Sequence, residues 1–177
     1  KLIEKINLST FQIENSVEKI NYFFSETDDN YCSLSYDSLG NTEIYMPIKN
    51  KIHILDADMK LKFVFENLNV FNSINSTATD HMGNIYFLET SNINSNLYKL
   101  NRNTLNLILI ENTLYPYKFL MASKDGTKIA AHTKHMFDSL KVYTFNLTGL
   151  SHISVFGDYD SRNCSIISND GSIMIFG

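Results

Sequence analysis

Short apolar runs recur along the chain and are separated by polar clusters rich in Asn, Ser, Asp and Gly. The clearest example is residues 80–111, whose apolar runs are 85–88, 97–100 and 105–110. Runs of β-branched and aromatic residues bounded by such clusters are typical of β-strands joined by turns. The stretch therefore predicts three consecutive strands, and residues 75–79 before the glycine turn predict a fourth.

The glycine turn recurs at a nearly constant spacing. Four glycines, separated by 43, 43 and 45 residues, carry the pattern: Gly40, Gly83, Gly126 and Gly171. Three residues before each glycine stands an Asp or a Ser: Asp37, Asp80, Ser123 and Ser168. Such side chains hydrogen-bond to backbone amides two or three residues further on, and they hold a turn that glycine completes.

A second landmark has the same period. A polar residue closes an apolar run and is followed by a short turn and another apolar run, at Asn7, Asp56, Asn101 and Asn146. These positions are separated by 49, 45 and 45 residues. A period of about 40–50 residues with four strands per unit is the range of β-propeller blades.

The predicted fold is therefore all-β, a β-propeller with four blades of four antiparallel strands, and residues 1–177 form one propeller domain or propeller segment. A lone four-stranded sheet cannot cover its own faces, whereas radial stacking buries both. The chain begins in the phase of a third strand and stops in that of a second strand. Two architectures stay open: a closed four-bladed ring, or a segment of a larger ring.

The D/S-x-x-G turns and the Ile-Tyr strand that follows them resemble the β-propeller repeat superfamily of WD40-like, YVTN-like and TolB-like blades. The resemblance covers essentially the whole chain. The chain has no Trp, so the Trp-Asp signature of true WD40 repeats is absent, and the Gly-His pair is missing too. The resemblance implies a fold and no particular family within the superfamily.

Composition narrows the possible partners. The net charge is −4, with 19% charged and 44% hydrophobic residues, which is ordinary for a folded domain and argues against a nucleic-acid binder. No apolar run approaches the roughly 20 residues of a membrane helix, and no signal peptide is visible. We expect a soluble protein and favour the cytoplasm. Because the chain starts at Lys1, we also expect that a leader or preceding domain was removed.

The two cysteines and two neighbouring histidines are the first candidates for chemistry. Cys32 and Cys164 both fall in the strand before a glycine turn, where we expect buried free thiols rather than a disulfide or zinc site. His132 and His135 lie at a strand end and in the following loop. Positions three apart on a strand face opposite sides, so we predict a polar loop and no metal or other cofactor.

The connectors between repeats hold the other candidates. Residues 158–162 pair two carboxylates but lack the Gly and distal Glu of a calcium loop, which favours a turn. Tyr side chains in the preceding connector are of a type favoured at binding surfaces. The predicted partner-binding residues are Tyr115, Tyr117, His132, His135, Asp158, Tyr159, Asp160 and Arg162.

These observations favour a non-catalytic domain that binds a protein or peptide through inter-blade loops on one propeller face. Two alternatives stay open. One is a small-ligand-binding or enzymatic propeller with a central funnel, although no nucleophile elbow or phosphate-binding loop is present. The other is an inhibitor or immunity-type protein whose acidic surface masks a basic partner.

The double substitution Tyr117→Ala and Arg162→Ala tests the predicted loop surface. If these loops bind the partner, capture of that partner is abolished and the melting temperature is unchanged. A pull-down assay paired with thermal unfolding measures both quantities. Unchanged capture would remove these residues from the binding site.

Overall fold

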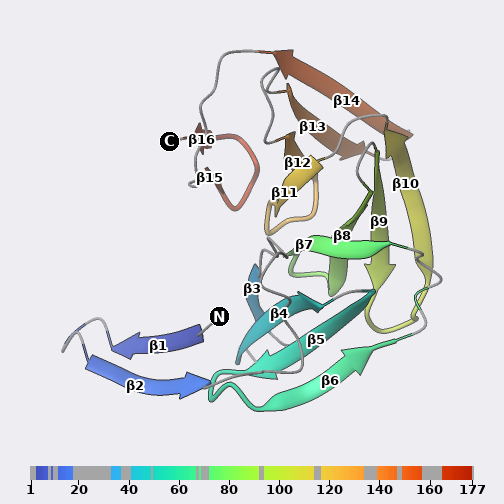
Figure 1. The fold of residues 1–177 in the computed structure, drawn as a ribbon. Helices are drawn as coiled ribbons and strands as arrows, with labels where there is room; N and C mark the ends of the chain where they lie inside the picture. Colours follow the sequence, from blue (N-terminus) through green and yellow to red (C-terminus); the bar gives the residue numbers. More distant parts are fainter. Residues whose placement is uncertain are drawn as a thin grey trace.

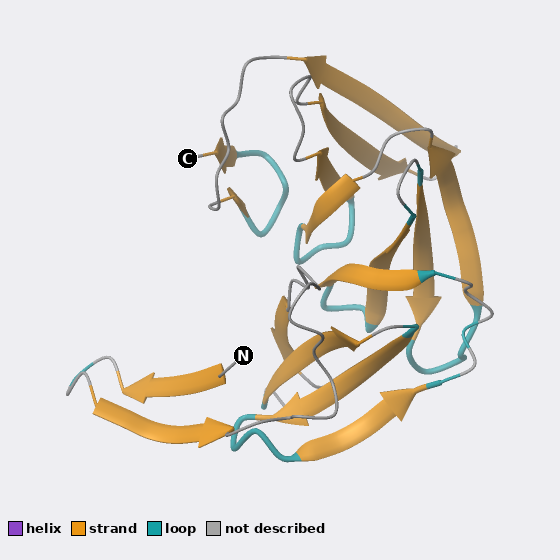
Figure 2. Ribbon diagram, viewed as in Figure 1, coloured by secondary structure: helices purple, strands orange, loops and turns teal. Residues whose placement is uncertain are grey.

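The structure is a computed structural model of the chain. It describes residues 3–7, 9, 12–17, 33–36, 41–48, 50–66, 68, 72–91, 94–113, 117–133, 139–146, 149–156 and 165–176. All regular secondary structure within these ranges is β-strand (Figure 2), as the alternation of apolar runs and turns predicted. Gly40, Cys32 and Cys164 lie outside the described residues.

The strands form three four-stranded antiparallel sheets, named here sheets 1 to 3, and two strand pairs (Figure 1). Sheet 1 contains β3 (Ser33–Tyr36), β4 (Thr42–Ile48), β5 (Lys51–Asp56) and β6 (Leu61–Phe65). Sheet 2 contains β7 (Ser73–Thr79), β8 (Asn84–Thr90), β9 (Ser95–Asn101) and β10 (Leu107–Thr113). Sheet 3 contains β11 (Tyr117–Ala122), β12 (Lys128–Thr133), β13 (Ser139–Asn146) and β14 (Gly149–Phe156). The pairs are β1 (Ile3–Asn7) with β2 (Gln12–Val17), and β15 (Ser165–Ile167) with β16 (Met174–Phe176).

The sheets follow one another along an arc (Figure 1). The first strand of each four-stranded sheet lies on the inner side of the arc and the fourth on the outer side (Figure 1). The predicted count of four four-stranded blades is not met in the described part of the chain. Three sheets have four strands, and the two terminal pairs are separate sheets. The predicted phase is nevertheless visible, because β1 and β2 precede the first complete sheet and β15 follows the last.

Both faces of sheet 2 are buried, and each is covered by a different neighbour. Along β8, Ile85 and Phe87 belong to an apolar cluster that includes Ile52 and Ile54 of sheet 1. Tyr86 and Leu88, which alternate with them, belong to a second cluster. That cluster includes Leu120, Ile129 and Ala131 of sheet 3. Successive side chains of a strand point to opposite faces, so one strand supplies two interfaces.

The glycine turns have the conformation that the repeat predicted. Gly83, Gly126 and Gly171 have φ values of 79°, 70° and 66°, in the left-handed region that glycine occupies without steric cost. Asp80 Oδ1 accepts hydrogen bonds from the amides of Met82 and Asn84, at 2.9 and 3.0 Å. Ser123 Oγ accepts from the amide of Lys128, and Ser168 Oγ accepts from that of Ile173. The serines therefore bond across the hairpin, to amides five residues on rather than two or three.

Neighbouring sheets are also joined by hydrogen bonds near their inner strands. The amide of His81 donates to the Lys124 carbonyl at 2.9 Å, and the amide of Asp125 donates to the Asn169 carbonyl at 3.1 Å. These bonds connect one glycine turn to the next. The Leu120 amide of sheet 3 likewise donates to Ser76 Oγ of sheet 2, at 3.1 Å. Neighbouring sheets are therefore connected on the inner side of the arc by hydrogen bonds as well as by apolar packing.

The second landmark of the repeat also marks strand ends. The four residues that close the third strand of their units are Asn7, Asp56, Asn101 and Asn146. Asn101 Oδ1 accepts hydrogen bonds from the amides of Asn103 and Thr104, both at 3.0 Å. The next strand was predicted to start at Leu105, but Leu105 has φ of 56° and belongs to the turn. Strand β10 begins at Leu107.

Alanine substitution of Gly83 and of Gly126 separates backbone strain from crowding. The left-handed conformation costs an alanine about 1–2 kcal/mol at either position. A Cβ at Gly126 would lie 2.5 Å from Asp80 Oδ2, whereas one at Gly83 meets its nearest atom at 3.5 Å. We expect Gly126→Ala to lower the free energy of unfolding by about 2–5 kcal/mol, since overpacking adds about 1–3 kcal/mol to the backbone strain.

Urea unfolding followed by circular dichroism measures both variants, with Gly83→Ala as the matched control. Equal losses would show that the Asp80 side chain moves aside without cost and that crowding between the turns of sheets 2 and 3 does not require glycine at position 126.

Candidate functional site

Most of the predicted partner-binding residues lie outside the described residues: Tyr115, His135, Asp158, Tyr159, Asp160 and Arg162. The backbones of the other two are described. Tyr117 begins β11 and pairs with Thr133, while His132 of β12 pairs with Phe119. The structure therefore places Tyr117 and His132 on adjacent strands at one end of sheet 3.

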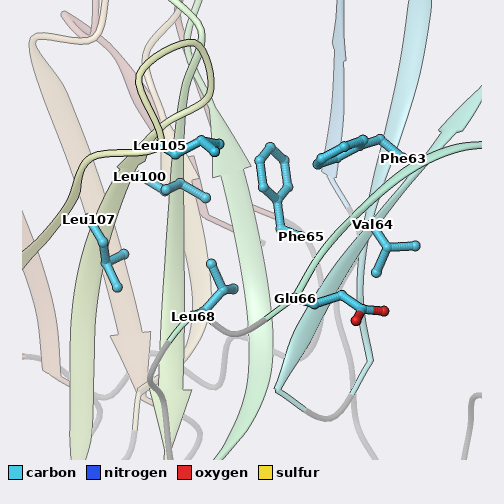
Figure 3. A pocket seen from close by; sticks show the side chains of 8 residues that line it. All are labelled: Phe63, Val64, Phe65, Glu66, Leu68, Leu100, Leu105 and Leu107. Carbon is cyan, nitrogen blue, oxygen red and sulfur yellow. The ribbon is translucent and has the colours of Figure 1, made fainter.

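An apolar groove lies between the outer strands of sheets 1 and 2, and sequence reasoning missed it (Figure 3). Its first wall is β6, where Phe63 and Phe65 pair with Ile54 and Ile52 and so share their face. Phe65 is buried in the cluster between the two sheets, but Phe63 is 50% exposed. The two rings meet edge to face, with centroids 4.8 Å apart.

The opposite wall is formed by the turn between β9 and β10 and by the start of β10. The Leu105 amide donates to the Asn101 carbonyl at 2.8 Å, which closes the turn. Leu105 is 60% exposed, whereas Leu100 is buried and Leu107 is half-buried against the cluster between the sheets. The groove thus has an exposed apolar rim on both sides and an apolar floor.

The groove encloses about 420 Å³. It is lined by Phe63, Val64, Phe65, Glu66, Leu68, Leu100, Leu105 and Leu107 (Figure 3). A volume of this size accepts a few large side chains or a small ligand. The single titratable lining group is Glu66, whose Oε1 lies 2.9 Å from Nζ of Lys51. Such a site can hold apolar groups and one cation, and it presents no nucleophile.

A buried ion cluster fixes the two walls relative to each other. Glu43 of β4 is fully buried, and Arg102 of the β9–β10 turn reaches it with Nη1 at 2.5 Å and Nη2 at 3.1 Å. Lys62 Nζ of β6 donates to Glu43 Oε1 at 2.6 Å, and the Tyr45 hydroxyl donates to Oε2 at 2.8 Å. Because Arg102 belongs to the same turn as Leu105, this cluster holds the groove wall against sheet 1.

The environment of Glu43 keeps its carboxylate charged. Burial would raise the pKa of Glu43, but the hydrogen bonds from Arg102, Lys62 and Tyr45 together outweigh burial and lower the pKa below 4.5. Burial raises the pKa of the Tyr45 phenol, and the hydrogen bond to Glu43 adds to that effect. The cluster is therefore ionised at neutral pH, with Tyr45 as a neutral donor.

Two other buried carboxylates are also satisfied by hydrogen bonds. Asp80 Oδ2 accepts from Asn84 Nδ2 at 2.7 Å and from the Tyr86 hydroxyl at 2.9 Å. Glu89 accepts from the amide of Asn72 at 2.8 Å, from Asn96 at 2.9 Å and from Tyr98 at 3.0 Å. Among the residues that the structure describes, no group of three or more His, Cys, Asp or Glu could hold a metal ion. Asp80 and Glu89 therefore stabilise the fold through hydrogen bonds within sheet 2 and its neighbouring loops.

Comparison with known proteins supports the fold. No protein-family model and no curated protein matches the chain. A chain in the crystal structure of the mitotic checkpoint complex is 18% identical, with a TM-score of 0.56, over 82% of this chain and 46% of its own. The Dos1 propeller is 10% identical, with a TM-score of 0.54, over 99% of this chain and 60% of its own. The present chain spans less than two thirds of either.

These likenesses and the antiparallel sheets show a β-propeller fold, which confirms the resemblance to propeller blades predicted from the repeats. At these identities the likeness establishes the fold alone. Within the described part of the chain, no helix is long and apolar enough to cross a membrane.

The substitution Glu43→Gln tests the ion cluster. Glu43 is fully buried, whereas its partners Arg102 and Lys62 are 28% and 37% exposed and can be hydrated when the carboxylate is removed. We therefore expect the loss of these charged hydrogen bonds to lower the free energy of unfolding by about 1.5–3 kcal/mol at pH 7. The folded-state pKa of Glu43 lies below 4.5, so its charge stabilises the fold above that pH. The difference between wild type and variant should therefore shrink as the pH falls below about 4.5.

Urea unfolding at a series of pH values measures this difference. Glu66→Gln is the matched control, because Glu66 belongs to an exposed pair whose loss costs at most about 1 kcal/mol. A Glu43→Gln loss as small as that of the control, or one independent of pH, would contradict the assigned role of the cluster.

Proposed function

We propose that residues 1–177 form a propeller domain or segment that binds a protein or peptide partner without catalysis, and that the groove between β6 and the β9–β10 turn is its binding site. One observation carries the proposal: Phe63 and Leu105 line the same apolar cavity of about 420 Å³ while remaining 50% and 60% exposed. Exposed apolar surface gathered in a hollow is characteristic of interaction sites.

The walls of the groove support binding because they are preorganised. Phe65 and Leu100 are anchored in the cluster between sheets 1 and 2, and Arg102 is held to buried Glu43. A partner that enters the groove does not have to order these walls, so less binding free energy is spent on them. Aromatic side chains such as Phe63 are also enriched at the cores of protein interfaces.

The chemistry of the lining favours binding over catalysis. Acid–base and nucleophilic catalysis need positioned titratable groups, and Glu66 is the one such group among the eight lining residues. Its carboxylate is already paired with Lys51. One structural neighbour belongs to the mitotic checkpoint complex, so a chain of this fold serves there within an assembly. The surface predicted around Tyr117, which the structure places at the start of β11, and around Arg162 stays a second predicted contact surface.

A groove variant tests the proposal. Phe63→Ser combined with Leu105→Asn removes both exposed side chains, and Asn tolerates the left-handed backbone at position 105. Short random peptides displayed on phage are selected on the wild-type protein, and the Kd of an enriched synthetic peptide is measured by fluorescence anisotropy. We expect the Kd to rise about tenfold or more in the variant, since interface anchors contribute more than about 1 kcal/mol.

The control combines Met82→Ser with Ile173→Ser. These residues are as exposed as the groove pair, at 68% and 60%, but do not line the cavity. The control should bind the peptide with unchanged affinity. Failure to enrich any peptide, or equal affinity for the groove variant and wild type, would refute the groove as the binding site.

A further inference from the structure

Resting on the proposed function of the groove, we infer that its ligand is an extended peptide that adds a fifth strand to the free edge of β6. Alternate large apolar side chains of this peptide fill the groove, and a Lys or Arg binds Glu66. Three features of the described residues lead to this inference: the unpaired strand edge, the direction in which β6 presents its side chains, and the charge at the end of the groove.

Within the described part of the chain, the outer edge of β6 has no partner strand. β6 is the last strand in the order β3-β4-β5-β6. An edge strand presents unpaired amide and carbonyl groups, and an extended peptide can satisfy them by strand addition. Leu61 and Phe63 on this strand are 55% and 50% exposed, so apolar side chains of β6 are open to contact with an added strand.

The groove lies on the face that such a peptide would extend. Phe63 and Phe65 share a face with Ile54 and Ile52, and that face packs on sheet 2. A strand paired with β6 continues the same face, and every second side chain of it points toward the wall that holds Leu105. Side chains on one face of a strand are about 7 Å apart. The ligand should therefore carry two large apolar residues at positions i and i+2.

A carboxylate beside the groove favours a cation on the other face of the added strand, because the Glu66 side chain points away from Leu68 and Leu107 (Figure 3). Glu66 follows the last residue of β6, and its partner Lys51 lies on β5. The side chains of the pair are 42% and 51% exposed, and exposed pairs contribute little to stability. A Lys or Arg of the peptide can thus replace Lys51 at low cost. The net charge of −4 favours a basic partner as well.

The test uses the displayed peptides selected on wild-type protein and their synthetic copies. We expect the enriched sequences to share large apolar residues at i and i+2 with a Lys or Arg close by. Glu66→Lys should weaken such a peptide about tenfold or more and improve binding of a copy in which Glu replaces the basic residue. Apolar residues spaced at i and i+3 or i+4, or no response to Glu66→Lys, would overturn the inference.

Methylation of the peptide backbone nitrogens tests strand addition separately from side-chain packing. Amides of a paired strand point alternately toward and away from their partner. Methylating one alternate set should weaken binding about tenfold or more, and methylating the other set should have little effect. If both sets are tolerated while binding still requires Phe63 and Leu105, the proposed function stands and strand addition is wrong.

A second copy of the chain is the competing occupant of the same edge. Sedimentation of wild type and of Phe63→Ser distinguishes it. A concentration-dependent dimer that the substitution abolishes would assign the groove to self-association and overturn the inference, whereas a monomer in both cases supports it.

Discussion

The sheets of this protein hold one another in place because each face of an inner sheet is covered by a different neighbour. β8 shows how one strand serves both sides: Ile85 and Phe87 pack toward sheet 1, while Tyr86 and Leu88 pack toward sheet 3. Burial of apolar surface is the main favourable contribution to folding, and neither face of sheet 2 could be buried without its neighbours. The order of the sheets along the chain is therefore also the order of the interfaces.

Apolar packing alone does not fix how one sheet is placed on the next, because it has little directionality. In this protein, hydrogen bonds between the sheets fix their relative position. Arg102 of sheet 2 meets buried Glu43 of sheet 1, and successive glycine turns are bonded through His81 with Lys124 and through Asp125 with Asn169. A buried carboxylate without partners would be very costly. The positions of Glu43 and its donors are consequently strong constraints on the junction between the sheets.

The groove is a consequence of the same arrangement. Sheets that radiate from an axis meet at their inner strands and diverge toward their outer ones. The Leu120 amide reaches Ser76 across an inner junction, whereas the outer strands β6 and β10 leave a cavity of about 420 Å³ between them. Phe63 and Leu105 are large, yet they do not close this gap. The exposed apolar surface of the groove therefore follows from the radial arrangement of the sheets.

Local sequence was sufficient to determine the strands, the turns and the repeat. Glycine is favoured where the backbone has positive φ, and an Asn or Asp that accepts from nearby amides marks the end of a third strand, so Gly83 and Asn101 could be recognised from the chain alone. The groove could not be recognised in this way. Alternation along β6 tells which residues share a face, but it carries no information on how far away the facing sheet lies. The exposure of Phe63 and the meeting of Arg102 with Glu43 were decided by the stacking of two sheets, because each depends on residues that are distant in the chain.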